Sequence, residues 1–188
     1  MPIIARRVVI FLLGCLPLMI LILGVLNQSL GGDPAKAIVL DTGRWALRWL
    51  FITLAVSPLV RYLHWRWLMI HRRMLGLFAL FYAVLQLLAC YQLILGGQLG
   101  YFFLELAKRP YILVGMPALL ILMALGVTST RGWMKRLGKR WQVLHRLVYL
   151  ALPLAWVHLL MQVRSSSYQA IIYGVIALLL LAVRVPSW

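Results

Sequence analysis

Two histidines lie inside one apolar stretch of membrane length, residues 141–162, which reads WQVLHRLVYLALPLAWVHLLMQ. His145 and His158 are 13 residues apart, or about 20 Å along an ideal helix, which is most of the thickness of a hydrocarbon core. Ionisable side chains at such depth are costly and usually functional. Because the chain has only three acidic residues, these imidazoles need another partner, and haem iron is the usual one between membrane helices. The spacing is typical of two iron sites that carry electrons across a bilayer in steps.

Each histidine also has a simpler interpretation. His145 follows a basic run and could lie at the level of the lipid headgroups, and His158 could be a hydrogen-bonded structural residue. An ideal helix also places the two side chains about 140° apart around its axis. Pro153 lies between them and removes the hydrogen bond to the Tyr149 carbonyl, so a kink there could change their relative direction.

Composition indicates an all-α, polytopic membrane protein with one domain over residues 1–188. The 188 residues are 64% hydrophobic and have a mean hydropathy of +0.96. A soluble protein is not this apolar, and the chain has no room for a sizeable soluble domain beside the membrane helices. The formal net charge of +16 would suggest nucleic acid in a soluble protein. Here the charges lie between apolar runs, so membrane topology explains them better and nucleic acid is not expected as a partner. No CxxCH motif is present, so haem would be held without covalent bonds.

Six apolar runs predict a bundle of six transmembrane helices. The second is expected to begin at Arg44 with Asp41 or Thr42 as its N-cap, and the segments around residues 61–73 and 128–140 are expected to be basic loops. Arg6 and Arg7 precede the first run and no small-x-small cleavage site follows it, so we expect a helix and not a removable signal. The predicted spans cover residues 8–26, 44–62, 73–95, 111–127, 141–162 and 170–183.

The distribution of Lys and Arg predicts the orientation, because the side richer in these residues is usually cytoplasmic. Both termini and the second and fourth loops should then be cytoplasmic, with His145 near the inner end of its helix and His158 nearer the outer end. The cytoplasmic set is Arg6, Arg7, Arg61, Arg66, Arg72, Arg73, Arg131, Lys135, Arg136, Lys139, Arg140 and Arg184, against Lys36, Arg44, Lys108, Arg109 and Arg164 outside.

Several motifs resemble the MsrQ family, which belongs to the ferric-reductase-like transmembrane superfamily. They are LGGDPAKAIVLDTGRWALRWL, SPLVRYL, RRMLGL, and TSTRGWMKRLGKRWQVLHRLVYL with the later HLL. The stretch LGKRWQVLHRLVY is the most specific piece, and the resemblance covers nearly the whole chain.

The resemblance implies a six-helix protein of the bacterial inner membrane that carries b-type haem and a flavin mononucleotide (FMN). It implies an electron-transfer subunit that takes electrons from the quinone pool or a cytoplasmic flavin reductase. The electrons go to MsrP, a periplasmic molybdenum-cofactor enzyme that reduces methionine sulfoxide in oxidised envelope proteins. The family's histidines map onto His145 and His158. The chain itself has no catalytic residues for sulfoxide reduction.

One position departs from the family pattern. The family has a histidine in the third predicted helix where this sequence has Gln86, at the expected depth of His158. An amide oxygen is a weak iron ligand beside imidazole, so Gln86 could complete the outer haem site weakly. It could equally make a helix–helix hydrogen bond.

The two remaining histidines lie in a basic segment. His71 begins the third predicted helix at roughly the level of His145 and could complete an inner cofactor site, or it could be a solvated loop residue, as could His64. The basic loops could also hold the flavin phosphate.

Two other functions compete with an electron-transfer subunit. A self-sufficient transmembrane metalloreductase needs a nicotinamide–flavin domain, and the sequence contains no GxGxxG for one. Gln86 favours a haem-free scaffold or transporter that kept the fold. A transporter should show Gly- or Pro-broken helices in two matching halves, and the sequence does not show them. An absorption spectrum separates this alternative from the haem protein.

Overall fold

A computed structural model of the chain describes residues 2–98, 100, 108–162 and 167–183, and within them every regular element is helical. Among these residues, five helical stretches are long and apolar enough to cross a membrane, and the last helix is apolar but shorter. The five stretches are Ile3–Leu26, Pro34–Leu63, Arg72–Ile94, Pro110–Val127 and Lys139–Gln162. The all-α class and the membrane-protein class are therefore confirmed, while the number of six spans stays a prediction. The elements are α1 (Ile3–Leu26), α2 (Pro34–Leu63), η1 (Arg66–Ile70), α3 (Arg72–Ala89), η2 (Cys90–Ile94), α5 (Pro110–Val127), α6 (Arg131–Leu137), α7 (Lys139–His145), α8 (Val148–Gln162) and α9 (Ser167–Ala182).

Helix α2 begins ten residues before the predicted start at Arg44. Asp33 is its N-cap, and its side chain accepts a hydrogen bond of 3.0 Å from the Lys36 amide. Pro34 occupies the first helical position, where its missing N–H costs nothing. Thr42, one of the two predicted caps, is instead fully buried inside the helix and donates to the Ile38 carbonyl. The prediction of Asp41 or Thr42 as the cap was wrong because Asp33–Pro34 is the stronger start.

The predicted helix over residues 141–162 lies within one stretch of membrane length, Lys139–Gln162, which a short turn interrupts. Helix α7 ends at His145, a turn covers Arg146 and Leu147, and α8 starts at Val148. The interruption lies at this turn, and Pro153 is inside α8. The predicted basic loop before it contains a helix of its own, α6, capped by the Thr130 side chain. The two candidate histidines thus belong to different helices.

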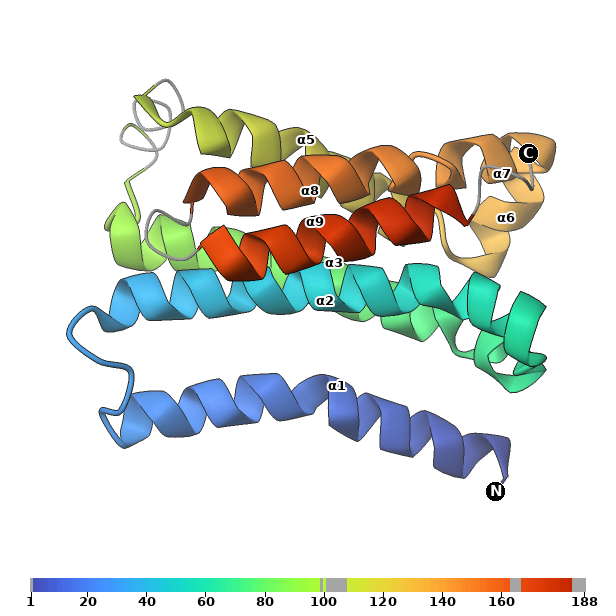
Figure 1. Ribbon diagram of the computed structural model, residues 1–188, viewed down its shortest axis with the longest axis horizontal. Coiled ribbons are helices and arrows are strands. Elements are labelled where there is room, and N and C mark those ends of the chain that lie inside the picture. The colour runs from blue at the N-terminus through green and yellow to red at the C-terminus, as the bar shows by residue number, and fades with distance from the viewer. Residues whose placement is uncertain (1, 99, 101–107, 163–166, 184–188) are drawn as a thin grey trace.

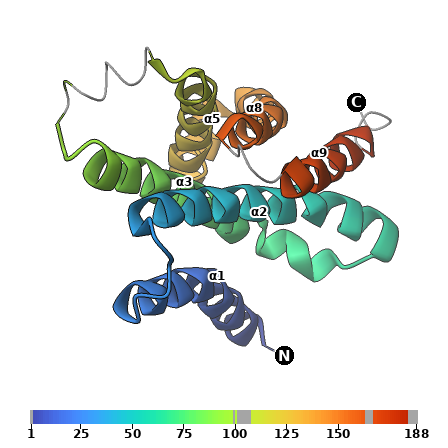
Figure 2. The ribbon, with the colours of Figure 1, turned by 60° about the vertical axis from the view of Figure 1, so that its left-hand side comes forward.

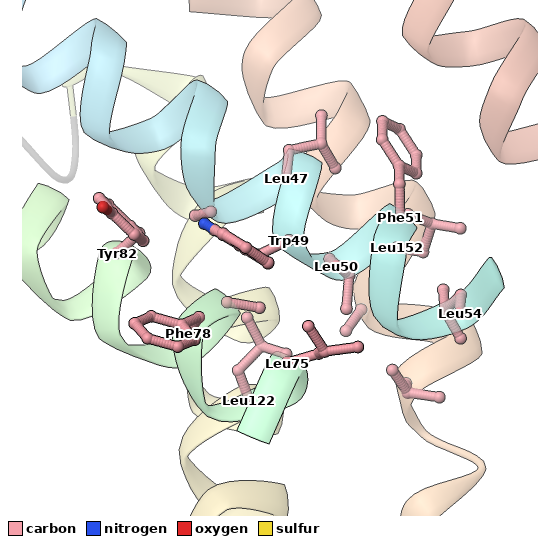
Figure 3. Packing of buried hydrophobic residues seen from close by; sticks show 14 of the residues in the cluster. Leu47, Trp49, Leu50, Phe51, Leu54, Leu75, Phe78, Tyr82, Leu122 and Leu152 are labelled. Atoms are coloured by element: carbon pink, nitrogen blue, oxygen red, sulfur yellow. The ribbon is translucent and has the colours of Figure 1, made fainter. Parts of the chain in front are cut away.

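The helices form an up-and-down bundle (Figure 1). Helix α2 packs most extensively on α3, and α5 on α8, while α9 lies against α8 and α2. Figure 2 shows α5 and α8 side by side above α2 and α3. The core between them is apolar and includes Leu50, Leu54, Tyr82 and Leu152, each no more than 2% exposed, and Figure 3 shows this packing. Helices α2 and α3 thus form one wall of a cavity, and helices α5 and α8 form the other.

Helix α1 is the outlying member of the bundle, and most of its large apolar side chains are exposed. The Tyr82 hydroxyl of α3 donates to the Gly14 carbonyl at 2.8 Å and accepts from the Leu18 amide at 3.1 Å. In a regular helix these two backbone groups would bond to each other. The inserted hydroxyl, together with Pro17 inside the helix, accounts for the bend of α1 (Figure 1).

The start of α1, the α2–α3 connection and the α6–α7 segment all lie at one end of the bundle (Figure 1). This is the arrangement that the predicted topology requires of the basic segments. Two cations used in the prediction, Arg164 and Arg184, lie outside the described residues. The direction of the bundle in the membrane stays a prediction.

Candidate cofactor site

A cavity lies between α2, α3, α5 and α8. It contains about 920 Å³ of space not filled by protein atoms, and this figure includes space open to the outside. Most of its wall consists of aliphatic side chains and two glycines. The polar or sulfur-containing lining residues are Gln86, Cys90, Tyr111, Met116, His158 and Gln162.

His158 contributes an oriented imidazole to this cavity. Its Nδ1 lies 2.6 Å from the backbone carbonyl oxygen of Tyr111. Since a carbonyl only accepts hydrogen bonds, Nδ1 carries the proton in this contact, and Nε2 of the neutral ring keeps its lone pair. Metal-binding histidines commonly have this arrangement, in which the second ring nitrogen donates to a backbone carbonyl. This geometry leaves the Nε2 atom of His158 free to bind a metal ion.

Two glycines allow the polar side chains to lie close to the neighbouring helices. A Cβ atom added at Gly115 of α5 would lie 2.5 Å from the Nδ1 atom of His158. A Cβ atom added at Gly43 of α2 would lie 2.5 Å from the Nε2 atom of Gln86. Real Cβ atoms essentially never come so close to other atoms. Both sites therefore depend on the absence of a side chain.

Gln86 and His158, predicted to share one depth, line the same cavity from α3 and α8. Within the described part of the chain, the Gln86 amide has no hydrogen-bond partner. The helix–helix hydrogen bond offered as its alternative role is therefore not seen there. Cys90, one turn further along, also lines the cavity at the start of the π-helical segment η2.

His145 is not part of this cavity. Its Nδ1 lies 3.1 Å from the Trp141 carbonyl oxygen, and its ring stacks on the Trp141 indole with centroids 3.9 Å apart. The Arg72 guanidinium is near enough to act on the ring electrostatically, so His145 is close to the start of α3.

His71 is the N-cap of α3 and is only 2% exposed, so it is not a solvated loop residue. Its Nδ1 is buried without a hydrogen-bond partner among the described residues, and its ring meets Trp67 edge to face. Burial lowers the pKa of His71, and the charges of Arg7 and Arg6 lower it further, which keeps the ring neutral at pH 7. His64 is exposed and ends α2, as expected for a loop histidine.

The structure thus brings Gln86 and His158 to one cavity and leaves His145 and His71 outside it. Across the described residues, no group of three His, Cys, Asp or Glu side chains is arranged to hold a bare metal ion. Sequence reasoning missed Gln162, although it lies four residues after His158 and thus on the same helix face. It also missed Gly115 and the Tyr111 carbonyl, which no local pattern reveals.

Comparison with known proteins gives a consistent result. A family described as "Ferric reductase like transmembrane component" matches residues 42–156. Proteins from Salmonella paratyphi B, Salmonella newport and Salmonella enteritidis are each 44% identical to this chain over 179 residues, which is 95% of the chain and 90% of each relative. Each of these relatives is named protein-methionine-sulfoxide reductase heme-binding subunit MsrQ.

Proposed function

Because the chain belongs to the ferric reductase like transmembrane family, with MsrQ heme-binding subunits among its relatives, we propose that it is the haem-carrying membrane subunit of a methionine sulfoxide reductase system. The observation that carries this proposal is His158, whose Nδ1 donates to the Tyr111 carbonyl at the wall of the four-helix cavity. An electron-transfer subunit needs a redox group that the protein binds in a fixed orientation, and it needs no catalytic residues of its own.

The residues around the cavity fit b-type haem. The wall is mainly apolar, as a porphyrin face requires, and the His158 ring offers one unprotonated nitrogen. When bound, b-type haem supplies reversible one-electron chemistry at its iron. His158 would hold the iron, the Tyr111 carbonyl would keep the imidazole in one tautomer, and the aliphatic wall would exclude water.

The opposite wall carries Gln86 where the family pattern has a histidine. Gln86 would give the iron a weak second ligand or none, because an amide oxygen binds iron more weakly than imidazole does. The same residue supports the alternative function, a haem-free membrane scaffold that kept the fold. Gln86 and His158 line one cavity, and the oriented imidazole there favours the haem protein, since a scaffold has no use for such a group.

A second, inner site would use His145 and His71. His145 ends α7 and His71 is the N-cap of α3, and these two helix ends lie at the end of the bundle that carries the basic segments (Figure 1). The Nδ1 of His71, which has no hydrogen-bond partner among the described residues, leaves a position for a ligand. The separation of His145 from the described cavity makes this site independent of His158.

The electron donor and acceptor are proposed from the resemblance to the MsrQ family, and the relatives' names support a role in a methionine sulfoxide reductase system. The protein would span the bacterial inner membrane six times and accept electrons from the quinone pool or a cytoplasmic flavin reductase. It would deliver them to an MsrP-type periplasmic subunit. FMN would bind at the cytoplasmic basic segments, where Arg and Lys can pair with its phosphate.

The function is tested with the purified protein in liposomes. A quinol or a flavin reductase should reduce its haem, and addition of the MsrP subunit with methionine sulfoxide should reoxidise it, as followed by the visible spectrum. Haem that is reduced but not reoxidised by MsrP and its substrate would contradict the proposed partner. A protein without haem would contradict the proposal as a whole.

A further inference from the structure

Gln162 is the last residue of α8, and its side chain lines the cavity. Its carbonyl oxygen is buried and has no hydrogen-bond partner in the part of the chain that the structure describes. Burying an amide without a partner is unfavourable, and most such groups in proteins are paired with protein, water or a ligand. Gln162 therefore has unused hydrogen-bonding capacity at the wall of the cavity.

The cavity is polar at one end and apolar at the other. Gln162 ends α8 and Tyr111 begins α5, and these two helix ends lie at the same end of the bundle (Figure 1). The Tyr111 hydroxyl accepts a hydrogen bond of 2.9 Å from Arg109, so a cation is also present at this end. The deeper wall is formed by side chains such as Leu50 and Leu122. A ligand that matches this wall has one polar, anionic edge and an otherwise apolar body.

Haem b has this character, because its two propionates lie on one edge of an apolar macrocycle. Resting on the proposed function, we infer that the Gln162 amide binds the propionate edge of the haem and thereby sets the orientation of the cofactor. The carboxylates then face the ends of α5 and α8, and the opposite edge faces the aliphatic wall.

The position of Gln162 relative to His158 suits this role. The two residues are four apart, so they lie on one face of α8, about 6 Å apart along the helix axis. Rotation by 180° about the Cγ–Cδ bond exchanges the amide oxygen and nitrogen, so the amide can turn its N–H donors to a carboxylate. One helix face thus supplies a ligand for the iron and a donor for the propionates. Gln162 is a positioning residue and takes no part in electron transfer.

The test compares two cofactors in three proteins. Wild type, Gln162→Met and the control Gln169→Met, whose side chain is exposed on α9, are loaded with haem b or with its dimethyl ester, which lacks the carboxylates. Transfer of the cofactor to excess apomyoglobin is then followed by absorbance. Gln162→Met should lose haem b roughly tenfold faster than wild type, the factor expected for one hydrogen bond to a charged group, and should lose the dimethyl ester at the wild-type rate.

Two results would overturn the inference and leave the proposed function standing. One is equal loss of haem b from wild type and Gln162→Met. The other is an equally faster loss of the dimethyl ester, which would mean that Gln162 acts by packing. A wild type that takes up no haem would instead overturn the proposed function, and this inference with it.

A second variant, Gln162→Glu, keeps the length of the side chain. Its carboxylate should repel the propionates once ionised, so loss of haem b should accelerate as the pH rises while loss of the dimethyl ester should not. Loss of haem b that is independent of pH and equal to the wild-type rate would contradict the inference.

Discussion

The Nδ1 atom of His158 on α8 lies 2.6 Å from the carbonyl oxygen of Tyr111 at the start of α5. This contact joins two helices that pack closely along their length and fixes which ring nitrogen is free for a ligand. Because the partner is a backbone atom, substitution of the Tyr111 side chain leaves the contact in place. The direction of the imidazole therefore depends on how closely α5 and α8 approach.

Gly115 sets that approach, and Gly115→Ala tests it. The added Cβ would lie 2.5 Å from the His158 Nδ1, so the ring must move and its hydrogen bond to Tyr111 must weaken. We expect a lower haem-to-protein ratio and a loss of roughly 1–3 kcal/mol in stability from overpacking. Gly76→Ala is the control, because its Cβ would make an ordinary 3.5 Å contact with Thr53. Equal haem ratios and equal thermal midpoints for the two variants would show that the close approach is unimportant.

Gln86→His restores the residue that the family pattern has at this position. A second imidazole across the cavity from His158 should convert the iron from partly high-spin to low-spin, block carbon monoxide binding and increase haem retention. The visible and EPR spectra of the variant and the wild type measure this change. The hypothesis of an open outer haem is wrong if the wild type is already fully low-spin and indifferent to carbon monoxide.

Tyr82→Phe removes the hydroxyl that bridges the Gly14 carbonyl and the Leu18 amide in α1. Tyr82 is 1% exposed, so its loss leaves buried backbone groups to find new partners, and we expect a cost of roughly 1–2 kcal/mol. Thermal unfolding in detergent measures it, with Tyr168→Phe as the control because Tyr168 is 73% exposed. If both variants unfold at the same temperature as the wild type, the bridge contributes nothing to the docking of α1.

The orientation in the membrane is tested by reporter fusions. A reporter fused after Arg140, in the basic segment before α8, should report the cytoplasm, and one fused after Lys108, before α5, should report the periplasm. Helix α7, which contains Arg140, and the start of α5, which follows Lys108, lie at opposite ends of the bundle (Figure 1). The reverse pattern would invert the direction of electron flow.

The sequence was sufficient for the helical class, because apolar periodicity is a local property. The shared depth of Gln86 and His158 stays a prediction, although both residues line one cavity. The helix boundaries were less predictable. The start of α2 was missed because Asp41 and Thr42 are also cap-forming residue types, although Asp33 followed by Pro34 is the stronger start. The turn between α7 and α8 was not predicted, since nothing in Arg146 or Leu147 favours a turn by itself, and a kink was considered only at Pro153.

The details of the site depend on contacts between distant segments. Gly115 and His158, or Gly43 and Gln86, are neighbours only after the helices pack. No periodicity in the sequence reveals such a pair, and the presence of a glycine in an apolar helix does not by itself show which side chain packs against it. The burial of His71 was also unpredictable from its basic surroundings, because Trp67 of η1 contacts its ring only in the folded chain.

The central claim is that His158 holds haem in the cavity between α2, α3, α5 and α8, and the absorption spectrum of the purified protein tests it most directly. The wild type and the control His64→Ala, which alters an exposed histidine, should both show a strong Soret band. His158→Ala should lose the haem of this site, and the double change His145→Ala with His158→Ala should abolish the band. A full Soret band in the double variant would contradict the claim, because the iron would then be held by other residues.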